Sequence, residues 1–526
     1  MTNGSDGLPR TTDVLVIGFG PVGAALCALL GRYGVTTLAV DKVAAVMRAP
    51  RAIALDNEAL RILQMAGLGE GAFERLAIPE VRMHCPYLGQ FGRANTSGTI
   101  DGHPKLVTFY QPDLEHALRR QVAAYPCVAF HSGYELVSFT QAEAGVTAQL
   151  KDGAGEIHEV VARYLVGADG ASSTVRGLIG QGFEGQTYPE DWLIVDAIRR
   201  EEKAIDHVEF ICHPDRPIPH MPAPGGRERW EFMLKPGETK EEMERPEKVA
   251  ELLAPWIAPE DLVIERKAVY RFHARCCELF QQGRVFLVGD AAHITPPFVG
   301  QGLVAGLRDV ANLGWKLAWV VRGQASPALL DSYDTERRPH ARKMIGLAKL
   351  MGHLVMPRNT FKALAVHGAM RLCRFIPPLR RQLEELEIKP PNRFREGCLV
   401  KGRARRGVCR GALLPQGFVR HQGQICPSDE VFGDHLTLVG FGVDPRQYLD
   451  EAAQARWQAR GGAFLQVGLR GQRPGAHTAF AEDLSDALAN NRSRGTVMVS
   501  RPDRVIMHDG PAQEAQRLVD ECLQAL

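Results

Sequence analysis

The stretch Val14-Leu15-Val16-Ile17-Gly18-Phe19-Gly20-Pro21-Val22-Gly23 decides the fold of this 526-residue chain. An apolar run typical of a buried strand leads into three glycines, and the apolar residues that follow recur at the spacing of one helix face. Gly34 ends this predicted helix, and residues 36–40 form a second predicted strand that closes on Asp41. In such a βαβ unit the glycines let the backbone approach a pyrophosphate, and the carboxylate binds a ribose hydroxyl. The pattern predicts a dinucleotide site made by Gly18, Gly20, Gly23 and Asp41.

The same glycine spacing also occurs in plain turns between a strand and a helix, so the surrounding residues matter. Residues 438–445 repeat the strand and the first two glycines, but they lack the third glycine. Pro445 also stands where a helix would have to continue. We therefore predict one dinucleotide site.

Composition narrows the classes of partner. The chain has 63 basic and 61 acidic residues, a formal net charge of +2, which leaves no overall field for nucleic acid or an anionic membrane. The N-terminus lacks the pattern of a signal peptide, and no apolar stretch approaches the roughly 20 residues of a membrane span. We expect a cytoplasmic protein that binds small molecules. The sequence leaves open whether it forms a homodimer.

The cysteines and histidines point to neither disulfides nor metal. The eleven cysteines are scattered and include no C-x-x-C, and the histidines show no spacing typical of metal ligands. No metal site is predicted.

Two further glycine motifs follow the first in a fixed order. They are Gly167-Ala168-Asp169-Gly170 and Gly289-Asp290-Ala291-Ala292-His293. Asp169 and Asp290 each have an alternative role as a helix cap. His293 is interpreted as a core histidine rather than a base. The three motifs together indicate a flavin nucleotide.

The pattern along the chain predicts an α/β protein. Residues 128–150 and 156–166 are predicted antiparallel strands, and residues 191–277 a mostly antiparallel inserted sheet that serves as a wall for the substrate. Residues 1–190 and 278–389 form the two parts of a Rossmann-like nucleotide domain with its helices. Residues 392–526 form a separate small α/β domain after the linker at Pro390-Pro391.

With these residues in view, the chain resembles the single-component FAD-dependent aromatic hydroxylases over about residues 12–345. Members that act on 3-(3-hydroxyphenyl)propionate are the most similar, through Pro50-Arg51-Ala52-Ile53, Asp215-Arg216-Pro217, residues 232–238 and residues 312–318. Several members carry a C-terminal thioredoxin-like domain. The resemblance implies such a domain here, with a structural role because the chain has no C-x-x-C.

The resemblance also assigns residues to the cofactor. It implies that Gly18, Gly20 and Gly23 hold the FAD pyrophosphate and that Asp41 binds the adenosine ribose. It implies that Arg51 and Gln111 contact the middle of FAD, and that Asp169 and Gly170 serve both FAD and the reduced nicotinamide. Asp290, in the motif that begins at Gly289, is implied to bind the ribityl chain. Pro297 and the turn Gly300-Gln301-Gly302 are implied to lie at the flavin ring. Backbone amides at the last of these positions can stabilise negative charge on the flavin.

By the same resemblance, NADH or NADPH reduces FAD, and molecular oxygen supplies the atom that enters a phenolic ring. Pro297 lies at the reacting end, and Arg216 is the predicted partner of a substrate carboxylate. An exposed arginine without this role is the alternative for Arg216. Leu303-Val304-Ala305 is apolar where polar residues are expected, which favours a less polar substrate.

Three other functions are alternatives. A hydroxylase of a larger polycyclic or polyketide aromatic shares the same fold. Flavin-dependent halogenases need a W-x-W-x-I setting that Trp315 and Trp319 do not supply. Prenyl-GTPase escort proteins share the nucleotide fold without catalysis, but they have no use for an intact set of flavin motifs.

Overall fold

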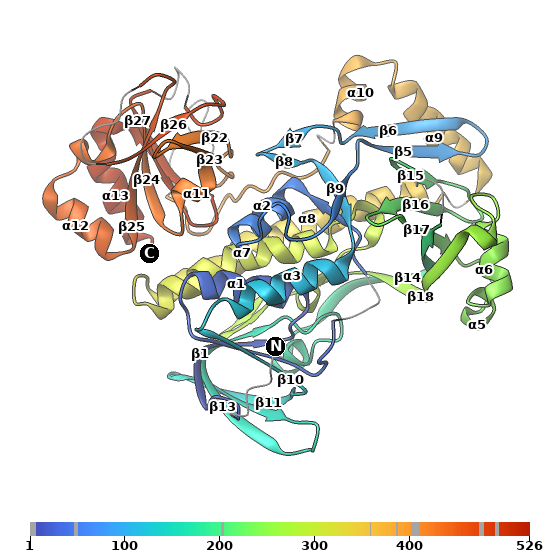
Figure 1. Cartoon of the computed structure of the whole chain (residues 1–526), viewed down its shortest axis with the longest axis horizontal. Coiled ribbons are helices and arrows are strands. Elements are labelled where there is room, and N and C mark those ends of the chain that lie inside the picture. Colours follow the sequence, from blue (N-terminus) through green and yellow to red (C-terminus); the bar gives the residue numbers. More distant parts are fainter. Residues whose placement is uncertain are drawn as a thin grey trace.

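The computed structural model describes residues 7–46, 51–200, 205–357, 359–385, 388–400, 410–472, 478–489 and 494–526. Pro50 of the motif at residues 50–53 therefore lies outside the described residues. Two large sheets with covering helices make up most of the molecule, and the C-terminal region lies beside α2 (Asn57–Met65) and α7 (Gly302–Val321) (Figure 1).

The first sheet contains the predicted βαβ unit. Its order is β10-β2-β1-β13-β12-β11, and β20 pairs with β13. The pairs among β10, β2, β1, β13 and β20 are parallel, whereas β11, β12 and β13 pair antiparallel. The prediction of antiparallel strands from residue 128 is thus wrong for β10, which runs beside β2 after the crossover helix α3. The bounds are β1 Thr11–Ile17, β2 Thr37–Asp41, β10 Val128–Ser132, β11 Glu135–Ala142, β12 Gly145–Lys151, β13 Ile157–Gly167, β20 Val285–Leu287 and α3 Gln111–Ala123.

Helix α1 (Pro21–Arg32) covers this sheet. Pro21 occupies its first turn, where a missing N–H costs nothing, and the residues from Gly23 to Gly31 are buried. The helix packs between α3 and α7. The glycine turn is therefore anchored on a fully packed element.

The second sheet has the order β21-β18-β14-β17-β16-β15-β5-β6. The predicted inserted sheet is present, with strands β14, β15, β16, β17 and β18. Two strands, β5 and β6, come from residues 80–95, outside the segment 191–277, and β5 pairs parallel with β15. The bounds are β5 Glu80–Cys85, β6 Gly89–Asn95, β14 Phe183–Arg199, β15 Val208–Ile211, β16 Ile218–Ala223, β17 Arg227–Met233, β18 Leu262–Cys277 and β21 His293–Ile294.

Helices close the second sheet on its outer face and at its β6 edge. Trp230 and Phe232 of β17 pack with Val249 and Leu253 of α6 (Pro246–Leu253) on the outer face. Helices α9 (Thr360–Cys373) and α10 (Pro377–Glu384) lie against β6, and α8 (Ser332–Val355) precedes them. In the described part of the chain, no helix is both long and apolar enough to span a membrane.

The C-terminal region is a mixed sheet with the order β23-β22-β26-β25-β24-β27-β28. Strands β24 and β25 are parallel, and β27 runs antiparallel to both β24 and β28. The bounds are β22 Phe418–His421, β23 Gln424–Pro427, α11 Ser428–Phe432, β24 Leu436–Phe441, α12 Glu451–Ala459, β25 Gly462–Gly468, β26 Ala479–Asp483, β27 Thr496–Ser500, β28 Ile506–Pro511 and α13 Ala515–Gln524.

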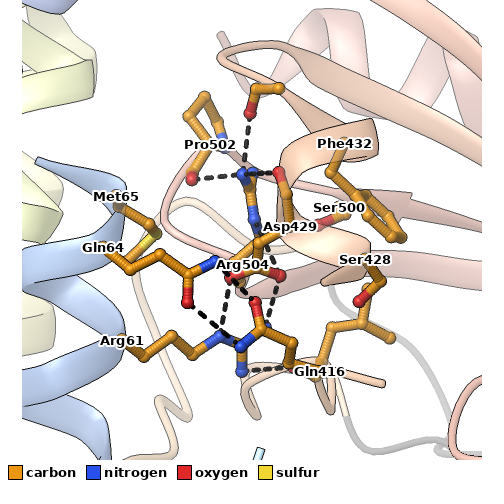
Figure 2. Close-up of polar contacts among 12 residues, drawn as sticks. Arg61, Gln64, Met65, Gln416, Ser428, Asp429, Phe432, Ser500, Pro502 and Arg504 are labelled. Carbon is orange, nitrogen blue, oxygen red and sulfur yellow. Dashed lines mark hydrogen bonds and ion pairs between the residues drawn. The ribbon is translucent and has the colours of Figure 1, made fainter. Parts of the chain in front are cut away.

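A buried ion pair joins this region to α2. The Arg61 guanidinium donates to both carboxylate oxygens of Asp429, at 2.7 and 2.8 Å, and to the carbonyl oxygen of Leu414 at 2.7 Å. Figure 2 shows Arg61 reaching from α2 to Asp429, with Arg504 on the other side of the same carboxylate, which it approaches to 3.3 Å. A two-pronged contact of this kind fixes orientation as well as distance.

A second buried cluster joins the C-terminal region to α7 and α8. Glu336 of α8 accepts from Lys316 of α7 at 2.8 Å and from both terminal nitrogens of Arg501, at 2.7 and 2.9 Å. The three charged side chains have 0% exposure. Because these buried charges compensate one another, the C-terminal region packs firmly against α7 and α8.

Candidate active site

One cavity of about 1180 Å³ lies between the first and second sheets. The glycine turn, the segment after Arg51, the Asp290 turn and the start of α7 line one part of it, and the inner face of the second sheet lines the other. The volume exceeds the roughly 300–1,000 Å³ of a pocket for one drug-sized ligand. The cavity has room for a dinucleotide cofactor and a second molecule.

The three glycines of the first motif have different tasks. Gly18 has φ +98°, and a Cβ there would lie 2.5 Å from the carbonyl oxygen of Ala168. A Cβ on Gly23 would lie 2.1 Å from the oxygen of Gly18, so both glycines are required by the turn itself. Gly20 lines the cavity, and a Cβ there would meet no other described atom within 4 Å. Gly20 therefore leaves its space to a ligand, as a pyrophosphate site requires.

Asp41 lies at the end of β2 and lines the cavity. Its carboxylate accepts hydrogen bonds from the backbone N–H groups of Phe19 at 2.7 Å and Val43 at 2.9 Å. A carboxylate has about four acceptor sites, so capacity remains for ribose hydroxyls. Asp41 thus both fixes the glycine turn and faces the place where a ribose would lie.

Arg51 and Gln111 both line the cavity. The side-chain oxygen of Gln111 accepts from the backbone N–H groups of Arg51 and Ala52, each at 2.8 Å, and its amide nitrogen donates to Glu115 at 2.7 Å. Both ends of the Gln111 amide are therefore engaged by the chain. Its role in this structure is to hold the segment that carries Arg51.

Asp169 caps a helix as well as lining the cavity. It accepts from the Ser173 hydroxyl at 2.5 Å and from the N–H of Val175 at 3.1 Å, at the start of α4 (Thr174–Leu178). Burial raises the pKa of Asp169. Asp169 can contact the start of α4 and also line the cavity, because Gly170, at φ +79°, turns the chain along the cavity wall beside Asp169.

Asp290 differs from Asp41 and Asp169 because its carboxylate has no hydrogen-bond or ion-pair partner within the described ranges. It lines the cavity, and burial raises its pKa against the opposing charges of His293 and Arg51. Desolvated carboxylates usually have partners. A row of ligand hydroxyls, such as the ribityl chain of FAD, fits this vacant acceptor.

The turn that presents Asp290 is held from behind. Gly289, at φ +59°, donates its N–H to Asp309 at 3.0 Å, and the same carboxylate pairs with His293 at 2.6 Å and Arg337 at 2.9 Å. His293 is buried against this carboxylate. Its position is that of a partnered core histidine.

The start of α7 faces the cavity. A 3-10 turn, Pro297–Val299, precedes Gly300 at φ +61°, and Gly302 begins the helix. The side chain of Gln301 is engaged by Asp56 and Arg308, so it is the backbone of Gly300, Gln301 and Gly302 that borders the cavity. Unpaired N–H groups and the helix dipole favour negative charge at this point.

One predicted site residue, Arg216, lies away from the cavity. The Arg216 guanidinium donates to Glu238 at 2.5 Å and to the carbonyl oxygen of Met233 at 2.9 Å, and it is not among the described residues that line the cavity. Arg216 precedes β16, and its local partner on the segment after β17 holds it away from the site. These contacts favour the alternative for Arg216, an arginine that does not bind the substrate.

We expect Arg216→Ala to leave substrate selection unchanged. The Michaelis constants for a carboxylated phenol and an uncharged phenol of matched size should each stay within about twofold of wild type, a factor worth only about 0.4 kcal/mol. Steady-state kinetics on both substrates gives the test. A rise confined to the carboxylated phenol would show that Arg216 reaches the ligand after all.

A group of polar residues on the inner face of the second sheet was not predicted from the sequence. They are Arg229 and Glu231 of β17 and Arg266 and Tyr270 of β18, and all four line the cavity. On β17 a sequence signal for them exists, because the polar residues Arg229 and Glu231 alternate with Trp230 and Phe232. The two aromatic side chains pack in the core on the outer face of the sheet.

Comparisons with known proteins agree with this site. A family model described as "FAD binding domain" matches residues 11–348, and one described as "HcaD C-terminal domain" matches residues 411–525. The chain is 35% identical over 511 residues to a 3-(3-hydroxy-phenyl)propionate/3-hydroxycinnamic acid hydroxylase of Burkholderia vietnamiensis, covering 94% of this chain and 93% of that protein. A Comamonas testosteroni hydroxylase of the same name is 32% identical, with 98% and 97% covered.

Two solved structures share the fold. The flavin-dependent monooxygenase PieE, in complex with FAD and substrate, superimposes with a TM-score of 0.80 at 22% identity, covering 98% of this chain and 99% of that one. Aklavinone-11 hydroxylase, with FAD and aklavinone, gives 0.77 at 23% identity, with 98% and 100% covered. The family match, the identities and the cavity agree, so this chain belongs to the FAD-dependent aromatic hydroxylases and is a flavoprotein monooxygenase.

Proposed function

We propose that this protein hydroxylates a phenol, using NADH or NADPH and molecular oxygen. The observation that carries the proposal is the shared cavity, in which a dinucleotide site and the inner face of the second sheet meet at the start of α7. The named relatives make 3-(3-hydroxyphenyl)propionate and 3-hydroxycinnamate the first substrates to test.

Bound FAD would supply the activation of oxygen, with electrons from the nicotinamide. The chain's own residues bind and orient: the turn from Gly18 to Gly23 holds the pyrophosphate and Asp290 accepts ribityl hydroxyls. Apolar side chains of the second sheet, among them Ile194 and Phe210, border the substrate part of the cavity. They exclude water from the reacting ring.

One observation favours a less polar phenol as a second candidate. The cations that line the substrate part are paired: Arg229 and Arg266 with Asp196, and Arg271 with Asp191. A substrate carboxylate would have to share one of these arginines with the aspartate that already binds it. Leu303 also faces the cavity, although Val304 and Ala305 of the same apolar stretch are buried in the core.

The finer architecture is part of the proposal. We assign residues 1–190 and 278–389 to the FAD domain, 191–277 to the substrate sheet and 392–526 to a thioredoxin-like domain. The parallel pair β24–β25 beside antiparallel β27 and β28, with α12 and α13, supports the last assignment. A homodimer and a cytoplasmic location remain predictions.

The purified protein is expected to release FAD on denaturation and to oxidise NADH or NADPH faster when a phenol is present. A panel of 3-(3-hydroxyphenyl)propionate, 3-hydroxycinnamate, 3-propylphenol and a polycyclic phenol ranks the substrate classes. With labelled oxygen gas, the product should carry one labelled atom. Release of FMN alone, or a new hydroxyl that comes from water, would contradict the proposal. FAD binding without oxidation of any phenol would favour the escort-protein alternative.

A further inference from the structure

The register of the second sheet places two rows of side chains on its inner face, and most of them line the cavity. Directly paired residues share a face. Asp196 of β14 pairs with Arg266 on one side and Arg229 on the other, and Arg229 pairs with Met221. The second row lies two residues further along each strand and contains Ala268, Ile194 and Glu231.

The charged side chains of the first row pair with one another, with two arginines sharing one carboxylate. Asp196 accepts from Arg229 at 2.6 and 3.1 Å and from Arg266 at 3.3 Å, and Arg266 also donates to the Tyr270 hydroxyl. Arg229 donates to the carbonyl oxygen of Arg51 at 3.1 Å. The row is therefore a fixed polar strip that ties the substrate sheet to the segment beside the cofactor part of the cavity.

The second row is apolar except for Glu231. Ile194 is its partner on β14, and Phe210 of β15 lies beyond Pro219 of β16, all lining the same cavity. Glu231 is 7% exposed and has no hydrogen-bond or ion-pair partner among the residues that the structure describes. The Glu231 carboxyl group therefore stabilises no contact within the sheet. A molecule bound in the cavity can be its hydrogen-bond partner.

We propose that Glu231 accepts the hydroxyl proton of the bound phenol, an assignment that rests on the proposed function. The phenolic O–H bond breaks as an O–H bond forms on the Glu231 carboxylate, which leaves a phenolate and a neutral carboxylic acid. The phenolate ring is the more electron-rich form that oxygen insertion requires. Glu231 returns the proton to the departing product or to water, so no other reactant is consumed.

The charges around Glu231 suit this role. Burial raises its pKa to about 7, while Arg229 and Arg266 lower it and Asp196 raises it. Tyr270 and His273 of β18 also line the cavity, and the Tyr270 hydroxyl is held by Arg266. A base with a pKa near the working pH is both ionised often enough and basic enough to accept a proton. Activity should therefore fall as the pH drops through about 7.

The test is Glu231→Gln, which keeps the size of the side chain and removes the base. General-base catalysis contributes about 10²- to 10⁴-fold, so at pH 7.5 kcat for an ordinary phenol should fall by at least roughly a hundredfold. The pH midpoint of kcat/KM should move from near 7 toward the value of a free phenol, about 10. FAD content should be unchanged.

A pre-ionised substrate separates proton transfer from simple damage. A nitro- or fluoro-substituted phenol that is already ionised at neutral pH should be hydroxylated by Glu231→Gln at nearly the wild-type rate. Glu265→Gln, a carboxyl of β18 paired with Arg227 at the surface, is the matched control and should keep the wild-type pH profile.

An unchanged pH profile in Glu231→Gln, or equal losses on ionised and un-ionised phenols, would overturn the assignment. Failure of the underlying function has a different signature, because then the wild-type protein would hydroxylate no phenol at any pH.

Discussion

Gly20→Val is expected to abolish FAD binding while the protein still folds. Gly20 has φ −71° and ψ −174°, an extended conformation that valine adopts readily, and its missing side chain points into open space on the cavity wall. A bound pyrophosphate would fill that space. Overlap of this kind costs on the order of 3 kcal/mol, and about 1.4 kcal/mol is tenfold in affinity, so FAD affinity should fall at least about a hundredfold.

The measurement is FAD titration followed by flavin fluorescence, together with urea unfolding of the apoprotein. The urea midpoint of the apoprotein should match wild type, and only the stabilisation by added FAD should disappear. Gly23→Ala is the contrasting variant: its Cβ would lie 2.1 Å from the Gly18 oxygen, so the turn itself must shift and the apoprotein should also lose stability. Tight FAD binding by Gly20→Val would show that the pyrophosphate lies elsewhere.

Glu336→Ala is expected to be among the most destabilising single changes in the chain. The substitution leaves Lys316 and Arg501 buried without their shared carboxylate. Removing one partner of a buried ion pair typically costs about 3–5 kcal/mol, a large part of the stability of an ordinary domain. Thermal and urea unfolding of the purified variant, or its loss from the soluble fraction, gives the measurement.

The pH dependence of the same cluster has a definite sign. Although burial alone would raise it, the charges of Arg501 and Lys316 hold the pKa of Glu336 well below its usual range. Its contribution to stability is therefore present above the ordinary carboxyl pKa of about 4.3 and is lost as the pH falls below that value. Asp520→Ala removes a surface pair with Arg456 and should cost less than about 1 kcal/mol. Equal losses for Asp520→Ala and Glu336→Ala would contradict the role of burial.

Short sequence motifs predicted those residues of the candidate site whose position is set within a single turn or strand end. The glycine turn, Asp41 and the start of α7 each lie within a short segment, and their spacing carries the backbone requirement directly. Asp290 was predicted for the same reason, since a single turn between β20 and α7 presents it. The fold class followed from the same periodicities.

Local patterns say little about residues whose position depends on distant partners. Arg216 was placed by the match of its guanidinium to a carboxylate, but its partner is Glu238, beyond the next two strands. Glu231 and Arg229 were missed because their direction depends on the register of β14, β17 and β18. Strands β5 and β6 join a sheet formed by residues more than a hundred positions later, a pairing that no local pattern contains.

The parallel pairing of β13 with β20, which joins Leu165 to Val285, governs how this chain folds during synthesis. At about 5–20 residues per second, roughly 6 to 24 seconds separate the emergence of the two strands from the ribosome. During that interval the glycine turn already exists, but the edge of β13 beside it is unpaired and prone to wrong pairings. Asp290 and α7 emerge later still. Flavin loading therefore comes after most of the chain has been made, and FAD content per polypeptide measures how much of a preparation completed this late closure.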